Sequence, residues 1–339
     1  MSERPLLLEV NNLKTYFFLD EGTVRAVDGA SFRIYRGQTV GVVGESGCGK
    51  SITARSILRI VPPPGRIVDG KILYHRVSGN GSGTTSEVID LTALDPKGRE
   101  IRAIRGAEIS MVFQEPMTSL SPVHTIGNQI MEAIILHQEV SKEEAREKAI
   151  DMLDRVGMPQ PRLTVDRYPH QLSGGMRQRA MIAMALSCHP SLLIADEPTT
   201  ALDVTTEAQI LQLMRSLQRD LGMAIMFITH NLGVVAQMTE DVIVMYLGKV
   251  VEVTDVDTLF YDPKHPYTQA LLKSIPRLGR KSRQRLASIR GSVPDPYAIP
   301  AGCPFHPRCD QVIRGVCDKD DPPMIPVAEG HEVRCHLYA

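Results

Sequence analysis

The sequence is poor in aromatic residues and has no long apolar run. It contains no tryptophan, and aromatic side chains make up only 5% of its 339 residues. No stretch approaches the roughly 18 consecutive apolar residues of a membrane-spanning helix, and Glu3 and Arg4 near the start argue against a signal peptide. The net charge of −1 lacks the basic excess of a nucleic-acid binder. We therefore expect a chain that folds in the cytosol and has no nucleic-acid partner.

What is present is an ordinary globular composition. Apolar residues make up 43% and charged residues 23%, which is enough for a sizeable core. The length suits one large domain with an appendage. Beyond about residue 255 prolines become frequent and the periodicity fades. We therefore expect a domain boundary in the region 255–275.

Strands and helices are expected to alternate along the chain. Helices are predicted at 50–60, 125–158 and 205–221, and Ser141 with Glu144 forms a capping-box pattern inside the second. Apolar runs predict strands at 6–10, 30–35, 39–43, 71–74, 88–91, 109–113, 191–195 and 224–229, and a hairpin around Gly248 from 242–247 and 249–253. Such alternation predicts a mostly parallel sheet that is covered on both faces.

A glycine-rich loop follows the predicted strand at 39–43. It fits the phosphate-loop pattern G-x-x-x-x-G-K-[ST] and reads Gly44-Glu45-Ser46-Gly47-Cys48-Gly49-Lys50-Ser51. Glycines let backbone N–H groups converge on phosphates, and the start of the next helix adds positive potential. We expect Lys50 to reach the β- and γ-phosphates of ATP, Ser51 to ligate Mg²⁺ and Cys48 to be a spacer. The alternative is an ordinary glycine-rich turn.

Two adjacent carboxylates end the apolar run at 192–195. Asp196 would hold Mg²⁺ directly or through water, and Glu197 would polarise or deprotonate the attacking water. Alone, the pair could be mere surface acids. Gln114 follows the strand at 109–113 and could sense Mg²⁺ or the water, and His230 follows the strand at 224–229 and could contact the γ-phosphate. Neither of these two side chains would be informative by itself.

A second anion cradle is predicted far from the first in sequence. Ser173 is a good N-cap for a long helix, and Gly174 and Gly175 expose backbone N–H groups at its start. An ordinary capped helix is the alternative. A simple phosphate-loop enzyme needs only one cradle, so two cradles favour a dimer in which each subunit contributes one to a shared nucleotide.

Together these motifs resemble the nucleotide-binding domain of ABC ATPases over about residues 5–255. The glycine-rich loop is similar to Walker A, 192–197 to Walker B with its catalytic glutamate, Gln114 to the Q-loop, 172–178 to the family signature, Asp203 to the D-loop and His230 to the switch histidine. The resemblance implies an aromatic side chain stacked on adenine, and Phe17 fits the spacing better than Tyr16.

This resemblance also implies the fold class and the domain organisation. We expect an α/β fold, with a P-loop NTPase core of ABC type at 1–258, a helical subdomain at about 115–185, and a small irregular C-terminal extension at 259–339. The segments 114–122, 265–268 and 303–309 resemble the ATPases of dipeptide and oligopeptide importers. That group also includes importers of oligosaccharides and nickel, so the cargo stays open.

The importer resemblance implies a set of partners. Two ATPase subunits, usually two paralogous chains, would sandwich two ATP molecules. They would drive two membrane-spanning permease subunits, supplied indirectly by an extracytoplasmic substrate-binding protein. The chain would then work as a peripheral subunit at the cytoplasmic face of the cell membrane.

Four of the six cysteines gather in the extension, at Cys303, Cys309, Cys317 and Cys335. In a cytosolic protein such a group indicates metal binding before disulfides. Four thiolates suit a [4Fe–4S] cluster or Zn²⁺. The lack of C-x-x-C pairs favours iron–sulfur, as does the importer resemblance, and the cluster would be structural. Buried thiols without a ligand are the third alternative.

Two other classes of protein have features that the sequence lacks. A soluble ABC ATPase acting on nucleic acid or ribosomes would carry a long insertion between the Walker motifs or a second ATPase domain. A module that binds nucleotide without turnover would have lost Glu197 or the signature, and both are present. The sequence therefore favours an importer ATPase that hydrolyses ATP.

Overall fold

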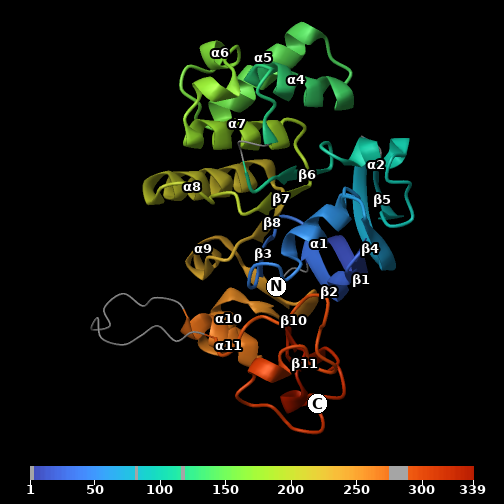
Figure 1. The fold of residues 1–339 in the computed structure, drawn as a ribbon. Coiled ribbons are helices and arrows are strands. Elements are labelled where there is room, and N and C mark those ends of the chain that lie inside the picture. The colour runs from blue at the N-terminus through green and yellow to red at the C-terminus, as the bar shows by residue number, and fades with distance from the viewer. Residues whose placement is uncertain (1–3, 81–82, 116–118, 275–288) are drawn as a thin grey trace. The chain divides into compact units, whose positions relative to one another are not determined.

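The computed structural model describes residues 4–80, 83–115, 119–274 and 289–339. The chain divides into two compact units, and Figure 1 labels its helices and strands. The loop unit contains the glycine-rich loop and comprises Leu6–Ile34, Thr39–Ala93 and Ile228–Ala339. The acid unit contains Asp196 and Glu197 and comprises Met1–Pro5, Tyr35–Gln38 and Leu94–Phe227. Across the described ranges, no helix has both the length and the apolar character needed to cross a bilayer.

The loop unit contains a four-stranded sheet in the order β2-β1-β4-β5. β1 (Leu6–Leu19) and β5 (Gly83–Asp90) pair antiparallel with β4 (Gly65–Asn80), and β2 (Gly22–Tyr35) is the other neighbour of β1. Helix α1 (Lys50–Ile57) is joined to the sheet where Thr15 Oγ1 and Ser56 Oγ lie 2.8 Å apart. The predicted strands at 6–10, 30–35, 71–74 and 88–91 are parts of these longer strands, whose polar ends do not alternate clearly. α1 ends before residue 60, earlier than predicted.

A second sheet of the loop unit carries the glycine-rich loop. β3 (Thr39–Val43) is wholly buried and pairs in parallel with β9 (Asp241–Tyr246). β9 turns through Gly248, at φ +80°, into antiparallel β10 (Lys249–Asp255), so the predicted hairpin is confirmed. The C-terminal extension continues this sheet, since β12 (His331–Val333) pairs with β10 and β11 (Ile325–Ala328) pairs with β12.

The extension contains several short regular elements. Besides its two strands it contains α11 (Pro266–Lys273) and the 3₁₀ turns His306–Arg308 and His336–Tyr338. Two further short helices of the loop unit, α9 (Leu232–Met238) and α10 (Val256–Tyr261), flank the β9–β10 hairpin in sequence. Most of the described part of the extension is turn or irregular structure, as expected, and strands as short as β11 and β12 leave little periodic signal in the sequence.

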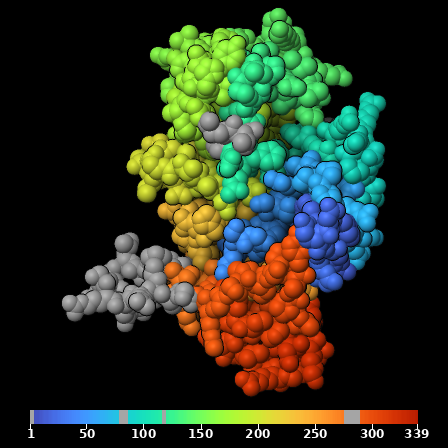
Figure 2. Space-filling view, in the orientation of Figure 1, coloured from blue at the N-terminus to red at the C-terminus, as the bar shows by residue number. Residues whose placement is uncertain are grey.

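Aromatic packing holds the extension against the sheet. The ring centroid of Tyr267 lies 4.6 Å from that of Tyr246 and 5.4 Å from that of Phe305, and all three rings are buried. In Figure 2 the orange surface of the extension lies against the dark blue N-terminal strands. The Tyr297 ring packs near Gly22 of β2. The extension thus shares a hydrophobic core with the strands that carry the loop.

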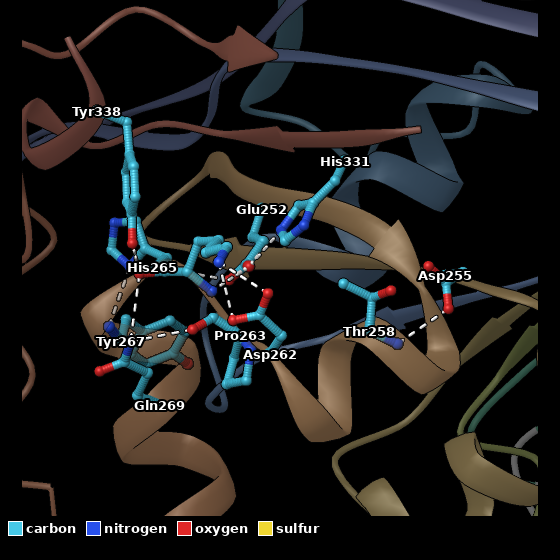
Figure 3. A network of polar contacts seen from close by, with 11 residues as sticks. Glu252, Asp255, Thr258, Asp262, Pro263, His265, Tyr267, Gln269, His331 and Tyr338 are labelled. Carbon is cyan, nitrogen blue, oxygen red and sulfur yellow. Dashed lines mark hydrogen bonds and ion pairs between the residues drawn. The ribbon is translucent and has the colours of Figure 1, made fainter. Parts of the chain in front are cut away.

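A buried carboxylate fixes the start of α11. Glu252 of β10 has no exposed surface and accepts the N–H groups of Lys264 at 2.7 Å and His265 at 3.0 Å, while His331 Nε2 lies 2.8 Å from it (Figure 3). His265 Nδ1 accepts the N–H of Tyr267 at 3.0 Å. Burial lowers the pKa of His265 to about 3, so its ring is a neutral acceptor. Tyr267 is thereby held in one orientation.

The acid unit combines buried strands with helices. β6 (Ile109–Val112) runs parallel to β7 (Leu192–Asp196), whose other neighbour is β8 (Ala224–Ile228), which belongs to this unit up to Phe227. Its helices are α2 (Arg99–Ile104), α4 (Ile126–His137), α5 (Lys142–Arg155), α6 (Pro161–Thr164), α7 (Gly174–Leu186) and α8 (Val204–Leu221), with a 3₁₀ turn at Pro169–Gln171. Ser141 and Glu144 form the predicted capping box. Because this box begins a new helix, the predicted helix at 125–158 is two helices.

Candidate functional site

The glycine-rich loop joins the buried strand β3 to helix α1 within the loop unit. Gly44 and Gly49 have φ angles of +153° and +100°, and residues other than glycine rarely adopt such backbone conformations. A Cβ atom on Gly44 would lie 2.2 Å from the Met245 carbonyl oxygen, and one on Gly49 would lie 2.3 Å from that of Ala26. Both positions therefore require glycine, and an ordinary turn would not need such close backbone packing at both ends.

Lys50 begins α1 and points back over this loop. Its side chain is buried, and Nζ donates hydrogen bonds to the carbonyl oxygens of Gly44 at 2.8 Å and Glu45 at 3.0 Å. The next residue, Ser51, is partly buried in the first turn of the helix. The loop therefore positions an ammonium group at a helix N-terminus, as an anion site requires.

The remaining loop residues divide into an exposed rim and a buried thiol. Ser46 and Gly47 are exposed, whereas Cys48 is buried beside Lys50, with Sγ 3.7 Å from Nζ. Burial raises the pKa of the Cys48 thiol. Since a nucleophilic cysteine needs a lowered pKa and access, this environment agrees with the prediction that Cys48 is a spacer.

Tyr16 and Phe17 occupy neighbouring positions of β1 with different surroundings. The Tyr16 hydroxyl donates to Asp28 at 2.6 Å, and burial together with this bond raises the pKa of Tyr16 to about 12. The Phe17 ring packs on Gly65, where a Cβ atom would lie only 2.5 Å from it. The choice of Phe17 over Tyr16 for the adenine stays a prediction.

His230 lies two residues after Ile228, the last residue of β8. It is exposed, and the N–H of the preceding Thr229 donates to the Val42 carbonyl of β3 at 3.2 Å. The histidine therefore follows a segment that runs beside the strand leading into the glycine-rich loop. Its role toward a phosphate stays a prediction.

In the acid unit, two donors hold the carboxylate of Glu197. Asp196 is buried at the end of β7, and Glu197 follows at a positive φ of +47°. Gln114 Nε2 donates to Glu197 Oε2 at 3.0 Å, and Thr200 Oγ1 donates to the same oxygen at 3.0 Å. Gln114 and Glu197, which lie at the ends of different strands, are thus brought together. Thr200 was missed as a partner, although three residues after Glu197 in a turn is a common place for one.

The predicted second cradle lies at the start of α7. Ser173 Oγ accepts the N–H of Met176 at 3.3 Å, so it is the expected N-cap. A Cβ atom on Gly175 would lie 2.8 Å from Thr206 Cγ2, which places this cradle beside the start of α8. Gly174 is exposed, in keeping with a role in binding a ligand from outside this unit.

Asp203 caps its own helix. Its carboxylate accepts the N–H groups of Thr205 at 3.1 Å and Thr206 at 3.0 Å, and the Thr206 hydroxyl at 2.7 Å. Hydrogen bonds from Thr206 and Thr205 hold the pKa of Asp203 below its usual value. Its predicted contact with a nucleotide would have to be made by a carboxylate already used as the α8 N-cap.

The sequence motifs that resemble peptide importers are distributed unevenly over the structure. Residues 116–118 of the segment 114–122 lie outside the described residues. Tyr267 and Arg308, which were noted only as marks of the importer group, both contact the glycine-rich loop through Glu45. No local sequence pattern predicts these contacts, because the residues that form them lie more than 200 positions apart.

All six cysteines are free, and the four of the extension line one small pocket. Burial raises the pKa of Cys303 to about 12 and also raises the pKa values of Cys309 and Cys335. Among the residues that the structure describes, no three His, Cys, Asp or Glu side chains converge closely enough to hold a metal ion. The four cysteines are therefore neighbours, as predicted, but a metal site is not confirmed.

Comparison with known proteins gives two family matches. Residues 27–200 match the ABC transporter family, and residues 251–317 match the oligopeptide/dipeptide transporter C-terminal region. The chain is 50% identical to the oligopeptide transport ATP-binding protein AppD of Bacillus subtilis (strain 168), over 98% of this chain and 97% of that protein. It is 46% identical to the dipeptide transport ATP-binding protein DppD of Escherichia coli (strain K12), over 97% and 96%.

Solved structures support the fold class. The ATP-binding cassette MJ0796, in a dimeric post-hydrolysis state bound to ADP and Pi, matches with a TM-score of 0.62 and 26% identity, over 74% of this chain and 99% of that one. CbiO1 of Clostridium perfringens, part of the ABC transporter complex cbiONQ, matches with a TM-score of 0.61 and 26% identity, over 76% and 92%. The expected P-loop NTPase core of ABC type is thereby confirmed.

Proposed function

The chain belongs to the ABC transporter family, and we propose that it hydrolyses ATP to power the uptake of dipeptides or oligopeptides. The observation that carries the proposal is the placement of Glu197, whose carboxylate is held by Gln114 and Thr200 at the end of a buried strand. A carboxylate fixed in this way can orient a water molecule and accept its proton. Relatives named for oligopeptide and dipeptide transport at 46–50% identity support the cargo class.

The loop unit supplies the groups that would bind the nucleotide. Backbone N–H groups of 44–51 and the start of α1 would cradle the phosphates, and Lys50 would move from the carbonyls of Gly44 and Glu45 to the phosphate oxygens. His230 would contact the γ-phosphate. Phe17, or failing that Tyr16, would stack on the adenine.

Magnesium would be held by side-chain oxygen donors. The Ser51 hydroxyl, the Gln114 side-chain oxygen and the Asp196 carboxylate are hard oxygen donors of the kind that Mg²⁺ prefers. The ion supplies charge neutralisation of the phosphate oxygens during transfer. Glu197 would remain the base that takes the proton of the attacking water.

A second ATPase subunit would complete the site. Ser173 caps α7 and Gly174 and Gly175 begin it, with Ser173 and Gly174 exposed, and this chain has its own phosphate loop as well. We infer that this cradle and Asp203 serve a nucleotide bound by the partner, which is a paralogous chain. The dimeric state named for MJ0796 supports such pairing.

The transport partners follow from the proposed importer. They are two membrane-spanning permeases, contacted around Gln114, and a substrate-binding protein outside the membrane that is reached indirectly. The chain would sit peripherally at the cytoplasmic face.

We also propose the division into an ATPase domain at 1–258, with its helical subdomain at about 115–185, and an extension at 259–339.

For the four cysteines of the extension we propose a thiolate-bound [4Fe–4S] cluster. Each sulfur has a backbone N–H as hydrogen-bond donor: Gln311 donates to Cys309 at 3.4 Å and Ile313 to Cys317 at 3.4 Å, and Phe305 and Leu337 serve Cys303 and Cys335. Such donors favour the thiolate form that metals bind. When bound, the cluster would supply a covalent staple between segments of the extension.

The cluster proposal is tested on the full chain purified without oxygen. We expect iron, labile sulfide and a visible charge-transfer absorbance, all lost in Cys309→Ser and retained in Cys188→Ser, whose thiol lies outside the pocket. Zinc in place of iron, or neither metal, would overturn the proposal.

The ATPase proposal is tested by Glu197→Gln in complex with the partner. We expect MgATP binding to persist and hydrolysis at this chain's Walker site to fall about 100-fold or more. Glu143→Gln, at an exposed position of α5, should hydrolyse ATP like the wild type. Cells that lack this chain should regain uptake of a labelled dipeptide with the wild-type gene but not with Glu197→Gln. Restoration of oligosaccharide or nickel uptake instead would reassign the cargo.

A further inference from the structure

A paired salt bridge joins the extension to the second residue of the glycine-rich loop. Arg308 Nη1 donates to Glu45 Oε2 at 2.7 Å, and Nη2 donates to Oε1 at 3.0 Å. The Arg308 side chain is 4% exposed and that of Glu45 is 24% exposed. Two parallel bonds between planar groups fix direction as well as distance, so the Glu45 side chain has one orientation.

Arg308 is itself held on its other sides. Its Nη1 also donates to the Tyr246 hydroxyl at 3.2 Å, and its Nε donates to the Arg290 carbonyl at 3.1 Å. Hydrogen bonding to Glu45 raises the pKa of Arg308 further. The arginine is therefore a fixed, charged group between the extension and the loop.

The backbone of Glu45 is held as well. Its N–H donates to the hydroxyl of Tyr267 at 2.8 Å. Tyr267 is fully buried, and its own position is set through His265 and Glu252 (Figure 3). Side chain and main chain of one loop residue are thus bound by two residues of the extension that lie more than 200 positions away in sequence.

Glu45 in turn positions the lysine of the loop. Its carbonyl oxygen accepts a hydrogen bond from Lys50 Nζ at 3.0 Å and from the Cys48 N–H at 3.3 Å. Rotation of the Glu45 peptide would move the carbonyl oxygen that holds the Lys50 ammonium group, and it would change the backbone conformation of the loop. The contacts therefore form a continuous path from Arg308 and Tyr267 through Glu45 to Lys50.

A separate ion pair, between Asp321 and Lys249, also joins the extension to the rest of the loop unit. Asp321 of the extension lies 2.7 Å from Lys249 Nζ, which lies 3.6 Å from Asp28, the partner of the Tyr16 hydroxyl. Through Lys249 and Asp28 the extension is thus also linked to Tyr16, the alternative to Phe17 for stacking on the adenine. A segment whose only task was to bury its own cysteines would not need contacts at both places.

We propose that Arg308 and Tyr267 are positioning residues of the ATP site, through which the C-terminal extension sets the conformation of the phosphate loop. The inference rests on the proposed binding of ATP phosphates by this loop. The contacts described above connect both residues to the phosphate loop, which would bind the nucleotide and not activate the water. Their loss should therefore weaken nucleotide binding and leave the chemical step almost unchanged.

The test is steady-state ATP hydrolysis by the full complex carrying Arg308→Ala, Arg308→Lys or Tyr267→Phe. We expect KM for ATP to rise about tenfold for Arg308→Ala, somewhat less for the other two, with kcat within twofold of the wild type. Arg314→Ala, at an exposed arginine of the same extension, should change neither constant. A merely structural role would instead lower kcat with the fraction of folded protein and leave KM unchanged.

A double-mutant cycle shows whether the salt bridge is the route. Glu45→Gln alone should raise KM about as much as Arg308→Ala, and the double variant should be no worse than either one. Wild-type KM values in Arg308→Ala and Tyr267→Phe, or additive effects in the cycle, would overturn the inference while ATP turnover persists. Absence of ATP turnover in the wild-type complex would instead refute the proposed function.

Discussion

The side-chain amide of Gln114 donates a hydrogen bond to the carboxylate of Glu197 across a distance of 3.0 Å. The two residues follow different strands of one parallel pair, β6 and β7, whose carboxyl ends meet at the same edge. A movement of the segment after β6 would therefore shift Gln114 and change its hydrogen bond to the Glu197 carboxylate. This contact relates the Q-loop, where the permeases would bind, to the residue that would act on water.

Replacing Gln114 by glutamate puts a second carboxylate beside Glu197. Like charges at this distance raise the pKa of the pair, so the base is partly protonated at neutral pH. We expect hydrolysis at pH 7 to fall about tenfold and to recover as the pH rises. A pH–rate profile checks this. Gln114→Ala, which lacks the added charge, should lose activity without the shift toward higher pH, and an identical profile for both variants would contradict the explanation.

Gly49→Ala should impair ATP binding strongly. The added Cβ atom would meet the Ala26 carbonyl at 2.3 Å, and the backbone would have to keep φ near +100°. Strain of order 1–3 kcal/mol corresponds to a Kd about 5- to 150-fold above the wild-type value. Titration with a fluorescent ATP analogue measures it. Gly222→Ala has a positive φ with no neighbour within 4 Å, and equal loss in that control would refute the steric explanation.

Cys48→Ala should keep ATP hydrolysis and change the alkaline stability. Burial raises the pKa of Cys48 in the folded chain, so below about pH 9 the thiol is protonated in both states and has no linkage effect. Above that pH the unfolded thiol loses its proton first, and the wild type loses stability. Thermal unfolding at pH 7.5 and pH 9.5 should show a larger drop in Tm for the wild type than for the variant. Equal drops would mean that Cys48 ionises normally.

Glu252→Ala should destabilise the loop unit. It removes the acceptor of two backbone N–H groups and the partner of His331 in a site with no exposed surface. The cost is about 3 kcal/mol, seen as a Tm several degrees lower. Glu332→Ala changes an exposed neighbour of His331 and should leave Tm almost unchanged. A wild-type Tm for Glu252→Ala would show that the network contributes little.

Features that depend on neighbouring residues could be predicted from the sequence. The glycine-rich loop, the Ser173 N-cap and the Ser141–Glu144 capping box each lie within a few residues, and all three are present as predicted. The hairpin at Gly248 belongs to the same class. Their residue types state the local backbone geometry directly.

Features that depend on contacts between residues far apart in the sequence could not be predicted from it. Arg308 and Glu45 are 263 positions apart, and neither residue type nor spacing indicates that they pair. Likewise β12 has only the residues His331–Val333, too few for a periodic pattern, and joins the sheet because β10 offers it an edge. The helical prediction at 125–158 missed a break for a related reason, since the sequence marked the new start at Ser141 without marking where the preceding helix ends.

The order of the strands in the sheet that carries the glycine-rich loop differs from their order along the chain, because β12 and not β11 pairs with β10. β10 at Lys249–Asp255 emerges from the ribosome well before its neighbour β12 at His331–Val333. Throughout that interval the outer edge of β10 presents unpaired N–H and C=O groups, to which strands of other nascent chains can add. Premature stop codons between the two strands should therefore produce aggregating fragments, and chaperones that cover strand edges should matter most while this stretch is being synthesised.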